Sequence, residues 1–308
     1  MSLLKQLATN PTLRNYAQDT AQRSIRLVAS FLAPTVEVPS KQGFFKKYDA
    51  KARYRPVKTR RGPTDRAVMI GFSADDGKYN LEGNAIDFPV PIEAAMDSTL
   101  ALNQAQYGGT LIADASAISH EAEVVDKALA AVGAGTDVNI AAANFDLIKY
   151  LDERILVVMK LARNGAPVRL LFGANAWLLI KNHASVKAQF KGGSGKKDSV
   201  PTMEEFSAML LGNPRIEVGF LVRDKAPDGA DADIDFMLTN QVIIFACSET
   251  PNTMDPSFMK TFRLMGQWMV PGSYERDDGR VEVLKMDWHE EIQVTNAPAA
   301  ERHNLNLS

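Results

Sequence analysis

The chain contains almost no cysteine. Cys247 is the single cysteine among 308 residues, so no disulfide bond can form within the chain. A zinc site built from cysteine ligands is excluded for the same reason. A protein that folds without disulfides fits a reducing cytoplasm. Because Cys247 ends the apolar run 241–247, we expect it to be a buried, small hydrophobic residue.

Long hydrophobic runs are missing as well. A membrane-spanning helix needs about 20 apolar residues, and the nearest run, 25–36, is shorter and contains Arg26 and Pro34. Charged residues are scattered through the first 26 positions, which argues against a secretory signal. We therefore expect neither a targeting peptide nor a membrane partner.

Complete catalytic motifs are absent from the sequence. No serine nucleophile elbow, dinucleotide fingerprint or cysteine nucleophile context is present. The segment 191–199, KGGSGKKDS, resembles a phosphate-binding loop, but Lys197 stands where that motif requires serine or threonine. The segment also follows a helical pattern instead of a strand, so we interpret it as a surface loop. We expect no enzymatic activity and no cofactor.

Two groups of acidic residues match metal-binding patterns incompletely. Asp287, His289 and Glu291 alternate along a β pattern and share one face, but no other histidine stands at the spacing of a metal-binding motif. The segment 228–235 has the charge of a calcium loop, yet Phe236 stands where the loop requires glycine. A solvated strand face and an exposed acidic loop are the favoured interpretations, and we expect no metal.

Positive charge is present in one unusual concentration. The net charge is −2, yet nine of the 23 residues from 44 to 66 are Lys or Arg, opposed only by Asp49 and Asp65. The β-prone pieces 44–54 and 66–72 flank a basic tip with Gly62-Pro63, and Asp76-Gly77 indicates a further turn. This pattern predicts a long β-hairpin.

A long helix is predicted over 92–132, ended by Gly133 and Gly135. The pair Gly108-Gly109 is expected to bend or split it. If continuous, the helix would be roughly 60 Å long, which is long for a compact enzyme domain. Apolar and small residues recur at spacings of four and three and predict one buried stripe: Leu111, Ala115, Ile118, Ala122, Val125, Leu129 and Val132.

The remainder of the chain mixes helices and strands, which gives an α+β class. Thr202 and Glu205 form a capping-box pattern at the start of one short helix. The first 36 residues have a loose helical stripe that Pro34 ends. Further helices are expected at 146–163, 174–190 and 202–211, and strands at 168–172, 215–222, 241–247 and 281–294.

Two stretches and the order of parts resemble the HK97-like major capsid proteins of tailed bacteriophages, and more specifically their lambda-like branch. The stretch 167–190 resembles the family's central-domain strand and following helix, with Trp177 and an ending that contains Asn182, His183, Val186 and Lys187. The stretch 269–308 resembles the family's C-terminal strand and tail.

The resemblance implies a division of the chain. Residues 1–36 would form an N-terminal arm and 37–91 an extended β-hairpin, the E-loop. A peripheral domain with a long spine helix and a β-sheet would comprise 92–145 and 263–308, and an α/β axial domain would comprise 146–262.

The resemblance also implies a function. The chain would be a major capsid protein that self-assembles through hexamers and pentamers into the icosahedral shell of a virion. Assembly would take place in the host bacterial cytoplasm, and the inner face of the shell would meet packaged double-stranded DNA. A separate scaffolding protein, a portal and a decoration protein would be its other partners.

We predict that the E-loop lies across an adjacent copy of the chain. An isolated hairpin is marginal in water, whereas a neighbour can cover its rings and pair its arginines with carboxylates. The expected contact residues are Phe44, Phe45, Lys46, Lys47, Tyr48, Arg53, Tyr54, Arg55, Lys58, Arg60 and Arg61.

Three other functions stay open. An encapsulin-like compartment shell shares the fold. A nucleic-acid-binding protein could use the basic 44–66 hairpin, with Tyr48 and Tyr54 stacking on bases, but the net charge of −2 argues against it. A soluble enzyme built on 140–262 would need convergent titrating groups, which the sequence does not indicate.

Overall fold

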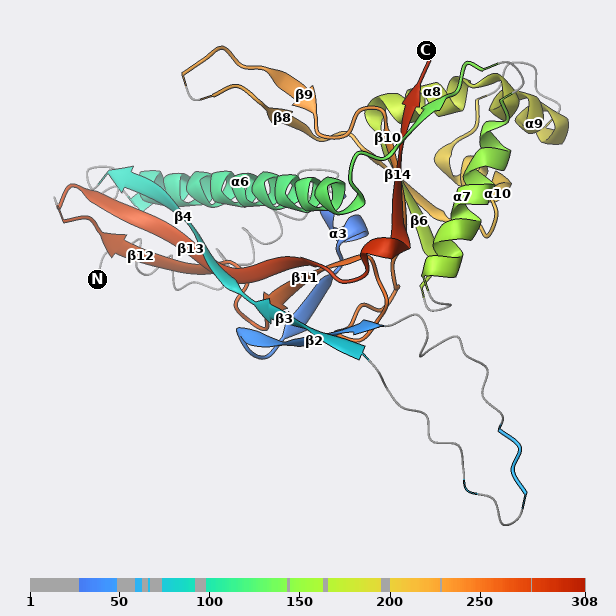
Figure 1. Cartoon of the computed structure of the whole chain (residues 1–308). Coiled ribbons are helices and arrows are strands. Elements are labelled where there is room, and N and C mark those ends of the chain that lie inside the picture. The colour runs from blue at the N-terminus through green and yellow to red at the C-terminus, as the bar shows by residue number, and fades with distance from the viewer. Residues whose placement is uncertain are drawn as a thin grey trace.

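The computed structural model describes residues 28–48, 59–62, 66, 74–91, 98–142, 145–162, 166–194, 200–227, 229–277 and 279–307. Two five-stranded sheets dominate this part of the chain, and one long helix, α6, contacts both of them (Figure 1). Helices and strands are mixed without regular alternation, so the predicted α+β class is confirmed. None of the described helices is long and apolar enough to cross a membrane.

The first sheet, here called the axial sheet, has the strand order β5-β14-β10-β6-β7. Strand β7 is parallel to β6 and β5 is parallel to β14, whereas β10 is antiparallel to both of its neighbours. The bounds are Thr136–Asn139 for β5, Val168–Gly173 for β6, Arg215–Gly219 for β7, Gln241–Ala246 for β10 and Ala300–Asn306 for β14.

Both faces of the axial sheet are buried. Leu170 and Phe172 of β6 pack on the helices of one face, whereas Leu171 belongs to a second core with α6 and the short helix α3. A strand that is buried on both faces needs an apolar residue at nearly every position, which explains the apolar runs 170–172 in β6 and 242–246 in β10. The helices are α3 (Ala29–Leu32), α7 (Leu147–Leu161), α8 (Ala174–Asn182), α9 (Ala184–Ser194) and α10 (Met203–Met209).

Local signals placed most of these helices correctly. The side chain of Asp146 caps α7, and the capping box of Thr202 and Glu205 is present at α10. The single helix predicted over 174–190 is wrong, because the chain is extended at His183 and separates α8 from α9.

The second sheet, here called the peripheral sheet, has the order β1-β11-β13-β12, with β4 on the other edge of β13. The long strand predicted over 281–294 is confirmed as β13 (Val281–Val294). The other strands are β1 (Thr35–Val38), β4 (Glu82–Pro91), β11 (Met259–Leu264) and β12 (Val270–Glu275).

Helix α6 runs without a break from Ser98 to Val132, so the predicted bend at Gly108-Gly109 is wrong. Glycine serves close packing there, because a Cβ at Gly108 would lie 2.4 Å from the ring of Phe88 on β4. The predicted buried stripe is also partly wrong: Leu111, Ala115 and Ile118 are exposed. The buried face consists of Ile112, Ala113, Ser116, Ala117, Glu121, Val124, Val125 and Ala128.

Two strands that the resemblance placed in the peripheral domain lie in the axial sheet. Strand β14 was assigned to the peripheral domain, but it pairs with β10 inside the axial sheet. Strand β5, also assigned to the peripheral domain, pairs with β14 there. The chain therefore returns to the axial sheet after β13, through the 3₁₀ turn η1 (Ala297–Ala299).

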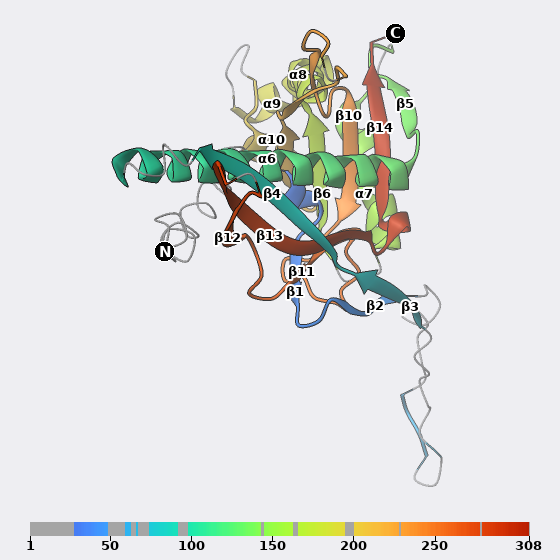
Figure 2. The same ribbon diagram turned by 90° about the vertical axis from the view of Figure 1, so that its left-hand side faces the viewer.

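Two hairpins complete the described fold. Strands β2 (Gln42–Tyr48) and β3 (Ala74–Asn80) pair antiparallel, so the turn expected at Asp76-Gly77 is wrong and that pair lies within a strand. Strands β8 (Val222–Asp224) and β9 (Ile234–Phe236) form the second hairpin, which interrupts the single strand predicted over 215–222. The two hairpins lie at opposite ends of the molecule (Figures 1 and 2).

Candidate assembly surfaces

Three stacked aromatic rings fasten the base of the β2–β3 hairpin to the peripheral sheet. The ring of Phe262 on β11 lies 5.5 Å from that of Phe45 and 4.9 Å from that of Tyr79, centroid to centroid. Each hairpin ring lies over the glycine opposite it in the register, Phe45 over Gly77 and Tyr79 over Gly43. A Cβ at either glycine would overlap the side chain opposite it, so only glycine permits this packing.

Polar contacts fasten the same base to β13. The Nζ atom of Lys41 lies 2.8 Å from Nε2 of His289, and the backbone N–H of Asn80 donates to Glu291 at 2.5 Å. Asp287, the third member of the face considered for a metal, accepts from Lys285. In the described residues no three His, Cys, Asp or Glu side chains are grouped to hold a metal ion. This face therefore anchors the hairpin.

The predicted contact residues fall into four groups. Phe44 is 62% exposed beneath Lys78, and Arg60 and Arg61 are exposed in the segment 59–62, which lies well apart from both sheets (Figures 1 and 2). The ring of Phe45 is buried against its own chain and retains 2% exposure. Lys46, Lys47 and Tyr48 belong to β2, and Arg53, Tyr54, Arg55 and Lys58 lie outside the described residues.

The β8–β9 hairpin is held at its root by an ion pair. Arg223 donates to both carboxylate oxygens of Asp126 on α6, at 2.8 and 3.1 Å. Asp224 accepts from the backbone N–H groups of Ala226 and Asp233, and these hydrogen bonds lower its pKa. A hydrogen bond from Lys225 lowers the pKa of Asp235 in the same way. Both carboxylates are therefore ionised at neutral pH.

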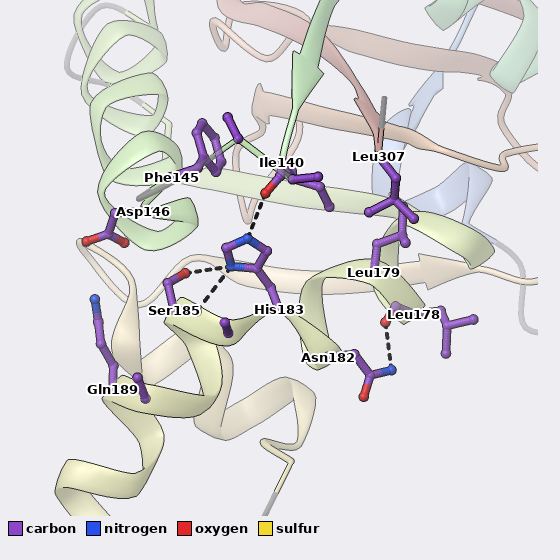
Figure 3. Close-up of a pocket in the computed structure, with 14 residues that line it drawn as sticks. Ile140, Phe145, Asp146, Leu178, Leu179, Asn182, His183, Ser185, Gln189 and Leu307 are labelled. Atoms are coloured by element: carbon purple, nitrogen blue, oxygen red, sulfur yellow. Dashed lines mark hydrogen bonds between the residues drawn. The ribbon is translucent and has the colours of Figure 1, made fainter.

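The open cavity of about 940 Å³ beside α8 and α9 is built around His183 (Figure 3). The Nε2 atom of His183 donates to the carbonyl oxygen of Ile140 at 3.0 Å, which leaves Nδ1 to accept from the hydroxyl of Ser185 at 2.7 Å. The Ser185 amide also reaches Nδ1, so His183 caps α9. Ser185 in turn accepts from the backbone N–H of Leu147.

This pair of serine and histidine is structural. Both side chains are used to join the starts of α7 and α9 and to separate α8 from α9, which explains the break in the predicted helix. Leu178 and Leu307, 51% and 63% exposed, make the rim of the cavity apolar.

A buried ion cluster joins α6 to the peripheral sheet. Glu290 of β13 accepts from Arg263 at 2.9 Å and from the indole N–H of Trp288 at 3.0 Å, and His120 Nδ1 of α6 lies 3.2 Å away. The guanidinium of Arg263 lies 3.3 Å from the ring centroid of Trp268. Burial raises the pKa of Glu290, but His120 and Arg263 outweigh burial and hold that pKa at about 2.

Glu121 is a second buried carboxylate that the sequence did not reveal. It accepts from the backbone N–H groups of Val28 and Ala29 at 2.8 and 2.7 Å, and so anchors the start of α3 to α6. Burial raises the pKa of Glu121 against these two hydrogen bonds. The position of Glu121 on an otherwise apolar helix face could have indicated a buried carboxylate. The sequence could not indicate its partners, which lie more than 90 residues away.

Comparison with known proteins gives a clear result only at the level of structure. No family model and no curated protein sequence matches the chain. The crystal structure of a phage-related protein from Bordetella bronchiseptica RB50 superposes with a TM-score of 0.70 over 96% of both chains, at 18% identity.

Two shell structures are also similar. The capsid of cyanophage P-SCSP1u matches with a TM-score of 0.53 at 12% identity, over 90% of this chain and 87% of that one. The SrpI encapsulin complex from Synechococcus elongatus PCC 7942 matches with a TM-score of 0.51 at 10% identity, over 91% and 88%. These likenesses show that the chain has the HK97-like fold predicted from its sequence, the fold of phage capsid proteins.

Proposed function

We propose that this chain is a major capsid protein that self-assembles into the icosahedral shell around the double-stranded DNA of a tailed phage. One observation carries the proposal. The arm, defined here as residues 42–80, is fastened at its base by the buried Phe45–Phe262–Tyr79 stack, whereas its described segment 59–62 lies far from both sheets (Figure 1) and the side chains of Arg60, Arg61 and Arg66 are exposed. A long hairpin with a rigid base and a cationic far end is suited to contact a neighbouring molecule.

Physical chemistry favours a neighbour as the partner of the arm. Two strands alone cannot bury enough apolar surface to be stable in water. A second copy offers carboxylates for the arginines and apolar surface for the exposed ring of Phe44. In a closed shell every subunit repeats the contact, so modest energies per contact are sufficient.

The lambda-like branch remains part of the proposal. Its partners would be the chain itself in hexamers and pentamers, a scaffolding protein, a portal and a decoration protein, with packaged DNA at the inner face. The location would be the virion, after assembly in the host cytoplasm. The role is structural and includes no turnover. The likeness to a phage-related protein at TM-score 0.70, against 0.51 for the encapsulin, supports a phage shell over a compartment shell.

Deleting the distal arm tests the proposal. Tyr48 and Ala74 lie opposite each other in the hairpin register, so an Asn-Gly pair in place of residues 49–73 closes the hairpin with a tight turn. We expect the purified wild type to form closed particles in negative-stain electron microscopy. The shortened variant should keep its circular dichroism spectrum and form no particles.

A second variant separates the length of the arm from its chemistry. Replacing 49–73 by a Gly/Ser linker of equal length keeps the reach and removes the side chains, and we expect it to fail as well. Intact shells from either variant would contradict the proposal. Salt-dependent DNA binding by an unassembled wild type would favour the nucleic-acid alternative, and native particles filled with a protein cargo would favour a compartment.

A further inference from the structure

The β8–β9 hairpin is an acidic counterpart of the arm. Between residues 224 and 235 the sequence has five aspartates and one lysine, whereas the segment 44–66 has nine Lys or Arg and two aspartates. Within 224–235 only Lys225 opposes the carboxylates, and it is already paired with Asp235 at 2.5 Å; Arg223 of β8 is paired with Asp126 on α6. The side chains of Asp231 and Asp233 are exposed.

The two oppositely charged projections cannot meet within one molecule. The β8–β9 hairpin and the described segment 59–62 of the arm lie on opposite sides of the molecule in both views (Figures 1 and 2). Attraction between them can therefore act only between copies. Such a contact is head-to-tail, because each copy keeps one hairpin and one arm for two different neighbours. Repeated contacts of this kind form a ring when the rotation between copies closes.

The β8–β9 hairpin has a fixed root and an exposed apolar face, both of which suit binding to a partner. Its root is fixed to α6 through Arg223 and Asp126, and Asp224 orders the turn through two backbone hydrogen bonds. Val222 and Ile234, 42% and 67% exposed, lie on one face of the two strands, since their register partners are Phe236 and Asp224. Apolar surface beside carboxylates suits arginine, whose stem packs while its guanidinium pairs.

We propose that the β8–β9 hairpin is the docking site for the basic arm of a second copy of this chain. The inference rests on the proposed shell function and names the surface that receives the arm. Nucleic acid does not fit this surface, because phosphate and the aspartates carry the same sign of charge.

Charge reversal in both surfaces tests the contact. The hairpin variant carries Asp231→Lys and Asp233→Lys, the arm variant carries Arg60→Glu and Arg61→Glu, and a third variant combines all four. We expect each double variant to raise the protein concentration needed for assembly about tenfold, because every subunit repeats the defect. The combined variant should recover most of the wild-type assembly. Glu153→Lys with Glu204→Lys, two exposed acidic residues elsewhere, is the control and should assemble normally.

Cysteine pairing provides an independent readout. The native Cys247 is buried, so a chain with Asp231→Cys and Arg61→Cys should show a ladder of oligomers on non-reducing gels after mild oxidation of its particles. Each single-cysteine variant should remain monomeric on the same gel.

The outcomes separate this inference from the proposed function. Two outcomes would refute the docking site and leave the proposed function intact. In the first, the wild type forms shells and the Asp231→Lys, Asp233→Lys variant assembles as well as the wild type. In the second, the combined variant assembles as poorly as the two double variants. The docking site would also be refuted if chelation of divalent cations abolished assembly and no disulfide-linked oligomers formed, because the aspartates would then bind a metal ion. A wild type that forms no shells would overturn the proposed function and this inference together.

Discussion

Glu290 should be the most sensitive polar position of the peripheral sheet. Its carboxylate receives Arg263 and Trp288 and lies beside His120, so it joins β11, β13 and α6. Replacing it with glutamine keeps the shape and removes the charge. The change also leaves the guanidinium of Arg263, which is mostly buried over Trp268, without its carboxylate. We expect Glu290→Gln to destabilise the fold substantially at neutral pH.

The magnitude follows from the shift in pKa. The pKa of Glu290 falls from 4.5 to about 2, and each unit corresponds to about 1.4 kcal/mol, so ionisation stabilises the native state by about 3 kcal/mol. The native pKa is depressed, so this contribution is fully present above about pH 4.5 and is lost as the pH falls toward 2. Glu290→Gln should therefore cost about 3 kcal/mol at pH 7 and progressively less below pH 4.5.

Urea unfolding of the unassembled protein at pH 7, 5 and 3 measures this difference. The fluorescence of Trp268 and Trp288 reports on the cluster directly, because the two rings lie 5.9 Å apart within it. Glu153→Gln, at an exposed position of α7, is the matched control and should have little effect. A cost below about 1 kcal/mol at pH 7, as for a surface ion pair, or a cost that does not change with pH, would refute the reasoning.

Two further predictions concern His303 and Gly77. Burial, assisted by the charge of Arg154, lowers the pKa of His303 to about 4, so the unfolded chain binds its proton first. The free energy of unfolding should therefore fall by about 3 kcal/mol between pH 6.5 and 4. In His303→Gln the midpoint of urea unfolding should not show this fall. The same fall in the variant would contradict the assignment of the pH dependence to His303. Gly77→Ala should displace the ring of Phe45 and cost about 2 kcal/mol, whereas Gly83→Ala, with its nearest atom 3.5 Å away, should be tolerated in the same unfolding assay. Equal costs for the two alanines would refute the role of Gly77.

The sequence was most informative where the cause of a structure is local. The capping box at α10 depends on residues three apart, and the buried strands β6 and β10 show their environment in the apolar runs 170–172 and 242–246. The long strand β13 follows from its own β pattern. The class of fold and the existence of most elements were therefore predictable before any tertiary contact was known.

Features that depend on distant contacts could not be predicted in this way. Gly77 was interpreted as a turn because Asp-Gly pairs favour turns, but its lack of a side chain serves the ring of Phe45 instead. Gly108 serves Phe88 similarly and does not bend α6. The return of β14 to the axial sheet, like the contact of Glu121 with α3, joins segments that are far apart in the sequence. Periodicity within one segment carries no information about such pairings.

The two hairpins share two features, a fixed root and exposed charge, and these features favour assembly over the monomeric state. Each is rigid where it leaves the body, through the aromatic stack in one case and through Arg223 and Asp126 in the other, and each exposes charge beyond its root. A rigid root reduces the conformational entropy that ordering would cost on association. Exposed charges of opposite sign guide the approach of two copies and set their relative orientation. Because the charged ends lie on opposite sides of the molecule, satisfying one contact leaves the other open for the next subunit. Growth therefore continues until a ring closes, and high salt should weaken its first contacts before it affects the fold of the subunit.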